Sequence, residues 1–161
     1  MPLKNPAMVS SKQHNWETPD KFMDILPVHF DLDVCAEPST AKADKYFTIE
    51  DDGLSQRWEG TCWMNPPYGR ALPPWIRKAY MESRQPYNKQ VWCLVPARTD
   101  TIWFQEAAKR GSVFFIKGRI SFLMDGKVLD PALFPSALVI FDSTLRPEMK
   151  LFDPKKDLLF L

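Results

Sequence analysis

The sequence predicts an α/β fold with a mostly parallel central sheet and flanking helices. Apolar runs of strand length alternate along the chain with segments of helical period, which favours a Rossmann-like sheet. The run at residues 91–95 is apolar throughout, as is typical of a strand covered on both faces. A chain of 161 residues can bury one good core. We therefore expect a single domain over residues 16–161, preceded by a flexible polar arm over residues 1–15.

The individual elements follow from apolar spacing and from turn residues. Thr18 is expected to cap a short helix that has Pro19 at its first position and ends at Pro27. Residues 37–60 are rich in acidic residues and short of apolar periodicity, so we expect mostly loop there. In chain order, the sequence predicts strands at 30–36, 46–48, 61–65, 91–95, 113–116 and 137–141, helices at 19–26, 73–85 and 100–110, and a turn at 124–127.

Charge is distributed unevenly, although the formal net charge is only +1. Residues 15–60 carry 11 acidic and 4 basic residues, whereas the rest of the chain carries 9 acidic and 17 basic residues. Between positions 70 and 89, five basic residues have only Glu82 as an acidic neighbour. Two interpretations of that run stay open: a solvated helix face, or a surface that contacts the phosphates of a nucleic acid.

Composition argues against a metal site and against a membrane protein. Cys35, Cys62 and Cys93 lie in apolar runs without a CxxC spacing, and the two histidines do not cluster with them. Reduced core thiols are therefore expected, with no metal. No apolar stretch approaches the roughly 20 residues of a membrane span, and no basic leader followed by an apolar stretch opens the chain. The sequence predicts a cytoplasmic protein without a membrane partner.

The most informative motif is Asn65-Pro66-Pro67-Tyr68-Gly69, which directly follows the apolar run 61–64. The two prolines fix two φ angles at about −65°, so the carbonyl groups of Asn65 and Pro66 are held in place. Tyr68 adds a flat aromatic face beside those acceptors, and Gly69 allows a sharp turn or a close approach of the backbone. Such a loop can grip a planar amine.

At this loop the chain resembles the amino-methyltransferases, whose [D/N/S]-P-P-Y loop receives an amino nitrogen beside S-adenosylmethionine. Further segments narrow the resemblance, and they occur in this order around the loop: Trp16-Glu17-Thr18-Pro19, Phe30 to Ala36, Asp52-Gly53-Leu54, Trp58, Pro96 to Thr101, Trp103-Phe104, Gly118-Arg119-Ile120 and Phe122. The ordered set is similar to the phage-type DNA N6-adenine methyltransferases over roughly residues 14–142.

The resemblance implies an abbreviated, Rossmann-like S-adenosylmethionine-dependent methyltransferase fold, with Asn65, Pro66, Pro67 and Tyr68 as the catalytic loop. The implied cofactor residues are Trp16, Thr18 and Pro19 at the methionine end, Asp33 and Ala36 at the end of the first strand, and Asp51 and Asp52 at the adenosine. For Asp51 and Asp52, a solvent-exposed carboxylate without a role in cofactor binding stays an open alternative. The glycine-rich turn common among methyltransferases is absent, and Cys35-Ala36-Glu37-Pro38 stands in its place.

The implied partner is double-stranded DNA, from which the target adenine must be flipped out. DNA contacts are expected from Arg70, Arg98, Arg119 and Lys127. Arg119 keeps two interpretations, a structural ion pair with an acid of residues 15–60 or a DNA contact. Trp103 and Phe104 are either a second wall for the flipped base or part of the core. The resemblance also implies a phage or prophage protein acting in a bacterial host cell, as a monomer or weak dimer.

Two alternatives to DNA adenine methylation stay open. The same loop serves glutamine-N5 methyltransferases and methyltransferases that act on RNA amines. A module of the same fold that binds DNA or cofactor without turnover is the second alternative, and the intact loop disfavours it.

Overall fold

The computed structural model describes residues 16–156, so the predicted arm over residues 1–15 lies outside the described residues. The helices are α1 (Asp20–Met23), α2 (Leu72–Ser83) and α3 (Ile102–Arg110), with single 3-10 turns at η2 (Gly53–Ser55) and η3 (Gly69–Ala71). The strands are β1 (Leu32–Asp33), β2 (Lys45–Tyr46), β3 (Gly60–Met64), β4 (Asn88–Pro96), β5 (Ser112–Ile116), β6 (Leu123–Met124), β7 (Lys127–Val128), β8 (Ser136–Phe141) and β9 (Met149–Phe152).

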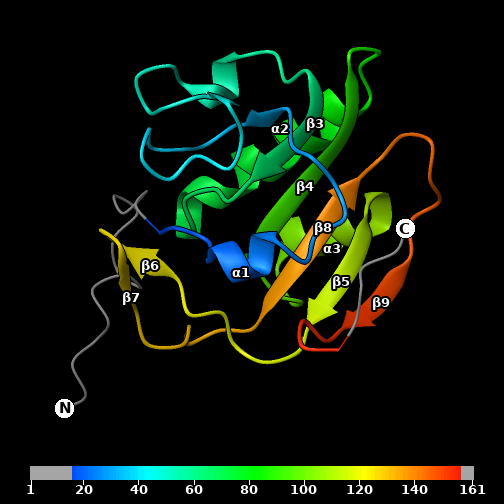
Figure 1. Ribbon diagram of the computed structural model, residues 1–161. Coiled ribbons are helices and arrows are strands. Elements are labelled where there is room, and N and C mark those ends of the chain that lie inside the picture. Colours follow the sequence, from blue (N-terminus) through cyan, green and yellow to red (C-terminus); the bar gives the residue numbers. More distant parts are fainter. Residues whose placement is uncertain (1–15, 157–161) are drawn as a thin grey trace.

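Seven of these strands form one central sheet in the order β2-β1-β3-β4-β8-β5-β9 (Figure 1). Every pair of neighbours in it is parallel except the two pairs that contain β8. The predicted α/β class with a mostly parallel sheet is thereby confirmed. The antiparallel direction of β8 was not predicted, because an apolar run carries no information about its direction.

The two faces of the sheet bury two separate apolar clusters. Alternate residues of β4 divide between them: Val91, Cys93 and Val95 face one cluster, and Trp92 and Leu94 face the other. Helices α2 and α3 cover the first face. The second face is covered by α1 and by long loops, and α1 lies in front of the sheet in Figure 1. Both faces of β4 are therefore buried, as its uninterrupted apolar run indicates.

The two longer helices form close to their predicted positions. Pro73 and Pro74 lie in the first turn of α2, where a missing N–H costs nothing, and Trp75 and Ala79 face the core. Thr101 caps α3, since its hydroxyl oxygen accepts a hydrogen bond from Phe104 N at 3.3 Å.

The prediction for the first helix was wrong in two respects. α1 spans only Asp20–Met23, and Pro19 rather than Thr18 occupies the cap position, without a side-chain cap. The Thr18 hydroxyl is instead bonded to the loop that follows β3.

Two further differences separate the structure from the predicted elements, whereas the predicted turn at 124–127 is confirmed. The strand expected at 30–36 is reduced to the two residues of β1, and β9 at the sheet edge was not predicted. The turn predicted at 124–127 is the tip of the small hairpin β6–β7, in which Asp125 and Gly126 both have positive φ. Two successive residues with positive φ match the hairpin turns that Asp-Gly favours.

Candidate active site

The carboxyl ends of β1 and β3 lie side by side. The strands run parallel in the register Leu32↔Cys62 and Asp33↔Trp63, and Val34 N donates to the Trp63 carbonyl at 3.1 Å just beyond β1. The segment after β1 and the loop Asn65–Tyr68 after β3 consequently begin at the same edge of the sheet. This is the edge at which open α/β sheets bind their ligands.

The Asn65 side chain is fixed by contacts at both ends of its amide. Its Nδ2 donates to the Trp16 carbonyl at 3.0 Å and to Thr18 Oγ1 at 3.2 Å, and its Oδ1 accepts from Tyr68 Oη at 3.0 Å. A backbone carbonyl can only accept, so the nitrogen of the amide must face Trp16. The orientation of the amide therefore follows from its neighbours, and Oδ1 is presented toward Tyr68.

The rest of the loop is held rigidly. Pro66 and Pro67 are buried. Gly69 has φ +83°, a conformation that glycine adopts without strain, and it is the first residue of η3, which continues into α2. Tyr68 Oη also lies 3.5 Å from the Leu94 carbonyl. Burial raises the pKa of Tyr68 well above its ordinary value, so its hydroxyl remains a protonated donor.

Tyr68 belongs to an aromatic cluster with Trp16, Phe122 and Phe134. Its ring meets each of the three others nearly perpendicularly, at interplanar angles of 77° to 87° and centroid distances of 5.5 to 6.4 Å. Trp16 in turn stacks on Phe122 and Phe134. Among residues 16–156, no ring stacks in parallel on Tyr68, so parallel stacking on that ring is unused.

Trp103 and Phe104 are not part of this cluster. Phe104 is buried against the opposite face of the sheet, where it packs near Phe115, and Trp103 packs against the same core. The interpretation as a second wall for a flipped base was wrong. The aromatic neighbours of Tyr68 come instead from position 16 and from the long segment between β5 and β8.

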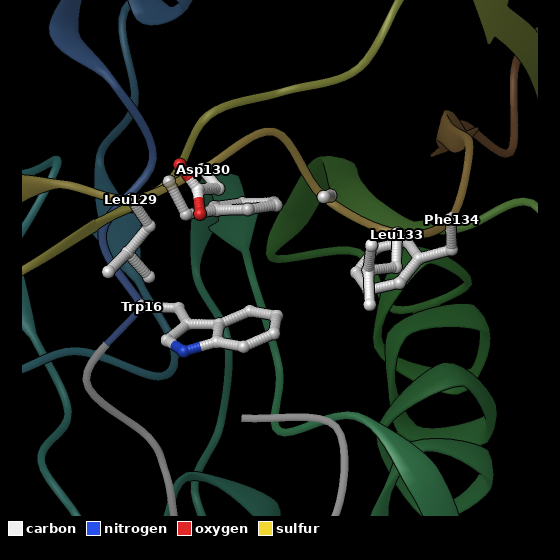
Figure 2. Close-up of a pocket in the computed structure, with 7 residues that line it drawn as sticks. Trp16, Leu129, Asp130, Leu133 and Phe134 are labelled. Carbon is white, nitrogen blue, oxygen red and sulfur yellow. The ribbon is translucent and has the colours of Figure 1, made fainter. Parts of the chain in front are cut away.

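A small pocket adjoins the aromatic cluster, between Trp16 and the loop before β8 (Figure 2). Leu129 and Asp130 lie on one side of the Trp16 ring, and Leu133 and Phe134 lie on another. The pocket has room for about one water molecule, so it does not hold an adenine in this conformation.

Asp33 is buried at the end of β1, with 3% of its surface exposed. Its two carboxylate oxygens accept hydrogen bonds from the backbone N–H groups of Cys35 at 3.2 Å and Lys42 at 3.0 Å. Burial raises the pKa of Asp33 to about 7, against the lowering effect of those two bonds. The carboxylate thus organises the segment 34–42, and the loop that replaces a glycine-rich turn closes around it.

The two acids at positions 51 and 52 differ in the hydrogen bonding of their carboxylates. Asp51 Oδ2 accepts from the backbone N–H of Thr48 at 2.8 Å and from its hydroxyl at 3.1 Å. Asp52 is exposed, has a positive φ of 51°, and makes no side-chain hydrogen bond within residues 16–156. The next residue, Gly53, packs so tightly that a Cβ there would lie 2.3 Å from the Val34 carbonyl oxygen. Asp52 is therefore held beside the end of β1.

The segment Trp16–Pro19 crosses between these two loops. Glu17 pairs with Leu123 through two backbone hydrogen bonds of 2.8 and 2.9 Å, and its carboxylate contacts Lys42 Nζ at 3.2 Å. The Lys42 ammonium, 9% exposed, also contacts Asp20 at 3.1 Å. Trp16 and Thr18 meet Asn65, and Pro19, half-buried, precedes α1.

The four cations predicted to contact DNA are all exposed, and none forms an ion pair with a carboxylate of the described residues. Arg70 follows the loop Asn65–Tyr68, and Arg98 lies over the Phe134 ring at 5.9 Å. Lys127 is in the β6–β7 hairpin. Arg119 donates to the Ala132 carbonyl at 3.4 Å, so its interpretation as an ion-pair partner of residues 15–60 was wrong for the described acids.

The three cysteines are held as protonated thiols. All three are free, and burial raises the pKa of Cys35 and of Cys62 to about 12 and that of Cys93 well above its ordinary value. In the described part of the chain, no three His, Cys, Asp or Glu side chains gather in a way that could hold a metal ion. None of the described helices is both long and apolar enough to span a membrane.

Comparison with known proteins points to one family. The family model for DNA N-6-adenine-methyltransferase (Dam) matches residues 6–157. This chain belongs to the Dam family. The DNA N-6-adenine-methyltransferase of Haemophilus phage HP1 (strain HP1c1) is 33% identical over 120 residues, which cover 71% of this chain and 68% of the relative. The enzyme of the same name from Escherichia phage T1 is 30% identical over 118 residues, which cover 69% of this chain and 48% of the relative.

Within this Dam family member, four parts of the site were not found from the sequence. Phe134 and the Leu94 carbonyl carry no local signal, because a phenylalanine in a loop and a carbonyl in a strand are ordinary features. Lys42 did carry a signal in the sequence. It is one of only four basic residues in the acidic stretch 15–60, which favours an ion pair between Lys42 and one of the nearby acids. The contact of Thr18 with Asn65 spans 47 residues and had no signal in sequence spacing.

Proposed function

We propose that this protein transfers a methyl group from S-adenosylmethionine to the N6 amine of an adenine flipped out of double-stranded DNA, on an abbreviated Rossmann-like sheet. One observation carries the proposal: at the carboxyl end of β3, the Asn65 amide is oriented by the Trp16 carbonyl so that Oδ1 faces the Tyr68 side. Family membership supplies the reaction class, and this geometry supplies an acceptor suited to an amine.

The chemical difficulty of this reaction is the weak nucleophilicity of the adenine amine, whose lone pair is delocalised into the ring. Asn65 Oδ1 and the Pro66 carbonyl both accept the N6 hydrogens and so favour a tetrahedral nitrogen with its lone pair directed outward. Because both acceptors are held before the substrate arrives, no reorganisation is needed at the reaction itself. Asn65 Oδ1 has a second lone pair besides the one that Tyr68 Oη occupies, so it can accept from Tyr68 and from the amine. No strong base is required, since the nitrogen loses its proton only after methylation has made it acidic.

The residues at the end of β1 fit the cofactor, which supplies an electrophilic methyl group when it is bound. Asp33 and Ala36 lie where the cofactor strand ends, Asp52 offers an exposed carboxylate that can accept from hydroxyl groups of the adenosine, and Asp51 shapes the turn before it. Trp16 and Pro19 close the site at the methionine end, whereas the hydroxyl of Thr18, expected in the same place, is engaged by Asn65. The carboxylate of Asp52 suits this role better than that of Asp51, which Thr48 already occupies.

In this proposal, DNA lies across the surface that carries four exposed cations, Arg70, Arg98, Arg119 and Lys127. Flipping the base costs a few kcal/mol, and stacking on Tyr68 returns roughly 1 to 3 kcal/mol. The absence of a carboxylate partner for these four cations in residues 16–156 leaves them available to phosphates.

The test is a comparison of acceptors. The purified chain is incubated with S-adenosylmethionine labelled in its methyl group and with duplex DNA, RNA or a protein mixture. Label is expected in DNA, and nucleoside mass spectrometry should find it in N6-methyladenine. Label in RNA or glutamine, with none in DNA, would assign the chain to the other amine acceptors.

A further inference from the structure

The buried Thr18 side chain contacts the proposed acceptor residue directly. Thr18 is 1% exposed, and its Oγ1 accepts from Asn65 Nδ2 at 3.2 Å. The same Nδ2 donates to the Trp16 carbonyl at 3.0 Å. The two amide hydrogens of Asn65 therefore have two acceptors from one short segment, 47 and 49 residues away in the sequence.

The segment that supplies these acceptors is itself fixed. Glu17 lies between them, and its backbone forms two hydrogen bonds to Leu123, while its carboxylate contacts the nearly buried ammonium of Lys42. These contacts tie the segment to β6 on one side and to the segment after β1 on the other. Trp16 and Thr18 consequently act as a rigid support for Asn65.

The support discriminates between the two orientations of the amide. If the amide were reversed, Oδ1 would face the Trp16 carbonyl, and two acceptors would oppose each other; Nδ2 would face the Tyr68 side, where it offers a donor to an amine that needs an acceptor. Thr18 Oγ1 fills the second donor position of Nδ2, so that no amide hydrogen is left without a partner in a half-buried site.

We propose that Thr18 is a positioning residue for methyl transfer: with the Trp16 carbonyl, its hydroxyl holds the Asn65 amide so that Oδ1 faces the target amine. The inference rests on the proposed function, and it assigns Thr18 an effect on turnover that is distinct from a cofactor contact.

The experiment compares Thr18→Val, which keeps the shape and removes the hydroxyl, with Thr18→Ser, which keeps the hydroxyl. Thr61→Val is the matched control, because Thr61 is a buried threonine in β3 whose hydroxyl makes no hydrogen bond among the described residues. The measurements are kcat with saturating DNA and cofactor, and the cofactor Kd by calorimetry. Thr18→Val should lower kcat about tenfold, the equivalent of one hydrogen bond. Thr18→Ser and Thr61→Val should stay near the parental kcat, and the cofactor Kd should be preserved in all three.

A double-mutant cycle separates positioning from general damage. In an Asn65→Ala background, Thr18→Val should cause no further loss of kcat, because the group that Thr18 holds is gone. A full additional tenfold loss there would overturn the inference. A parental kcat with a raised cofactor Kd in Thr18→Val would overturn it as well, and would make Thr18 a cofactor contact.

A second measurement needs neither a folded variant nor a substrate. Hydrogen exchange of the Asn65 side-chain amide, followed by NMR in the unmodified protein, should be slowed for both Nδ2 hydrogens. Exchange as fast as in an exposed asparagine would contradict the contact. If the unmodified protein fails to methylate DNA, the proposed function fails, and this exchange measurement still decides whether Thr18 holds Asn65.

Discussion

The ends of the two neighbouring strands β1 and β3 are organised in opposite ways. At the end of β3, the loop that carries Asn65 is held by groups from distant segments: the backbone carbonyls of Trp16 and Leu94 and the side-chain hydroxyl of Thr18. At the end of β1, the organising group is the carboxylate of Asp33, which binds backbone N–H groups of its own following segment. The proposed acceptor side, at the end of β3, thus depends on tertiary contacts, and the proposed cofactor side, at the end of β1, on local backbone contacts. Substitutions at the two ends should therefore separate turnover from cofactor binding.

The largest effect is expected for Asn65→Ala. Removal of one preorganised acceptor should lower kcat by roughly 100- to 1000-fold, by analogy with the loss of one oxyanion-hole donor. Cofactor affinity, measured by calorimetry, should be nearly unchanged, because the side chain contacts the segment 16–18 and Tyr68 rather than the end of β1. An equal loss of cofactor binding would move the loop from catalysis to cofactor binding.

Tyr68 contributes a ring and a hydroxyl to the acceptor side, and two substitutions separate them. Tyr68→Ala removes the ring proposed to stack on the base, and should cost about 1 to 3 kcal/mol in kcat/KM for DNA. Tyr68→Phe keeps the ring and removes only the hydroxyl, with its contacts to Asn65 Oδ1 and to the Leu94 carbonyl, so its effect should be smaller. If Tyr68→Phe is as impaired as Tyr68→Ala, the hydroxyl rather than the ring is what matters.

On the cofactor side, Asp33→Ala should weaken S-adenosylmethionine binding by roughly 1 to 3 kcal/mol, through loss of a charge-assisted hydrogen bond or of the loop that Asp33 organises. Calorimetry on the folded variant gives the dissociation constant. A parental value would refute the role of Asp33 in the cofactor site.

The raised pKa of Asp33 also predicts a pH dependence of stability. The carboxyl titrates near 3.8 in the unfolded chain and at about 7 in the folded protein, so the folded state binds more protons between these values. Its contribution to stability is therefore full at low pH and is lost as pH rises toward 7, with a slope of at most about 1.4 kcal/mol per pH unit. In urea unfolding from about pH 4.5 to 7.5, Asp33→Asn should remove this slope, and an identical pH profile in the variant would contradict the assignment.

The smallest effect concerns the DNA face. Replacement of Arg70 and Lys127 together should reduce the slope of log K against log salt by about 0.9 for each phosphate that is no longer neutralised, and raise the KM for DNA. Cofactor affinity should be preserved. Lys109→Ala with Lys150→Ala is a suitable control, because these two exposed cations lie outside the basic run 70–89 and are paired with Glu106 and Glu148. A parental salt slope in the Arg70/Lys127 variant would place the duplex elsewhere.

Local signals in the sequence account for much of the fold. The strand β4 and the helices α2 and α3 have long, regular apolar patterns, and these elements lie close to their predicted ranges. The short strand β1 and the edge strand β9 differ from the predicted elements. Hydrogen bonding to neighbouring strands, rather than a long apolar pattern, makes these residues strands. Three of the four residues of β9 are exposed.

The candidate site likewise has a part that the sequence predicts and a part that it does not predict. The motif Asn65–Tyr68 was recognisable because proline and tyrosine act locally, through fixed backbone angles and a flat ring. The support of Asn65 by Trp16 and Thr18 was not recognisable, because nothing in the sequence indicates which distant segment packs against the loop. The same limit explains why Trp103 and Phe104 were considered as a wall for the base: helical spacing shows that they share a helix, but not which face of the sheet that helix covers.

The most direct test of DNA adenine methylation at Asn65 is modified-base sequencing of genomic DNA from a methylation-free bacterial host that expresses the chain or its Asn65→Ala variant. N6-methyladenine is expected at a defined sequence context with the parental chain, and at most trace levels are expected with the variant expressed to the same amount. Absence of methylated adenine with the parental chain, or equal methylation by the two proteins, would contradict a role of Asn65 in this reaction.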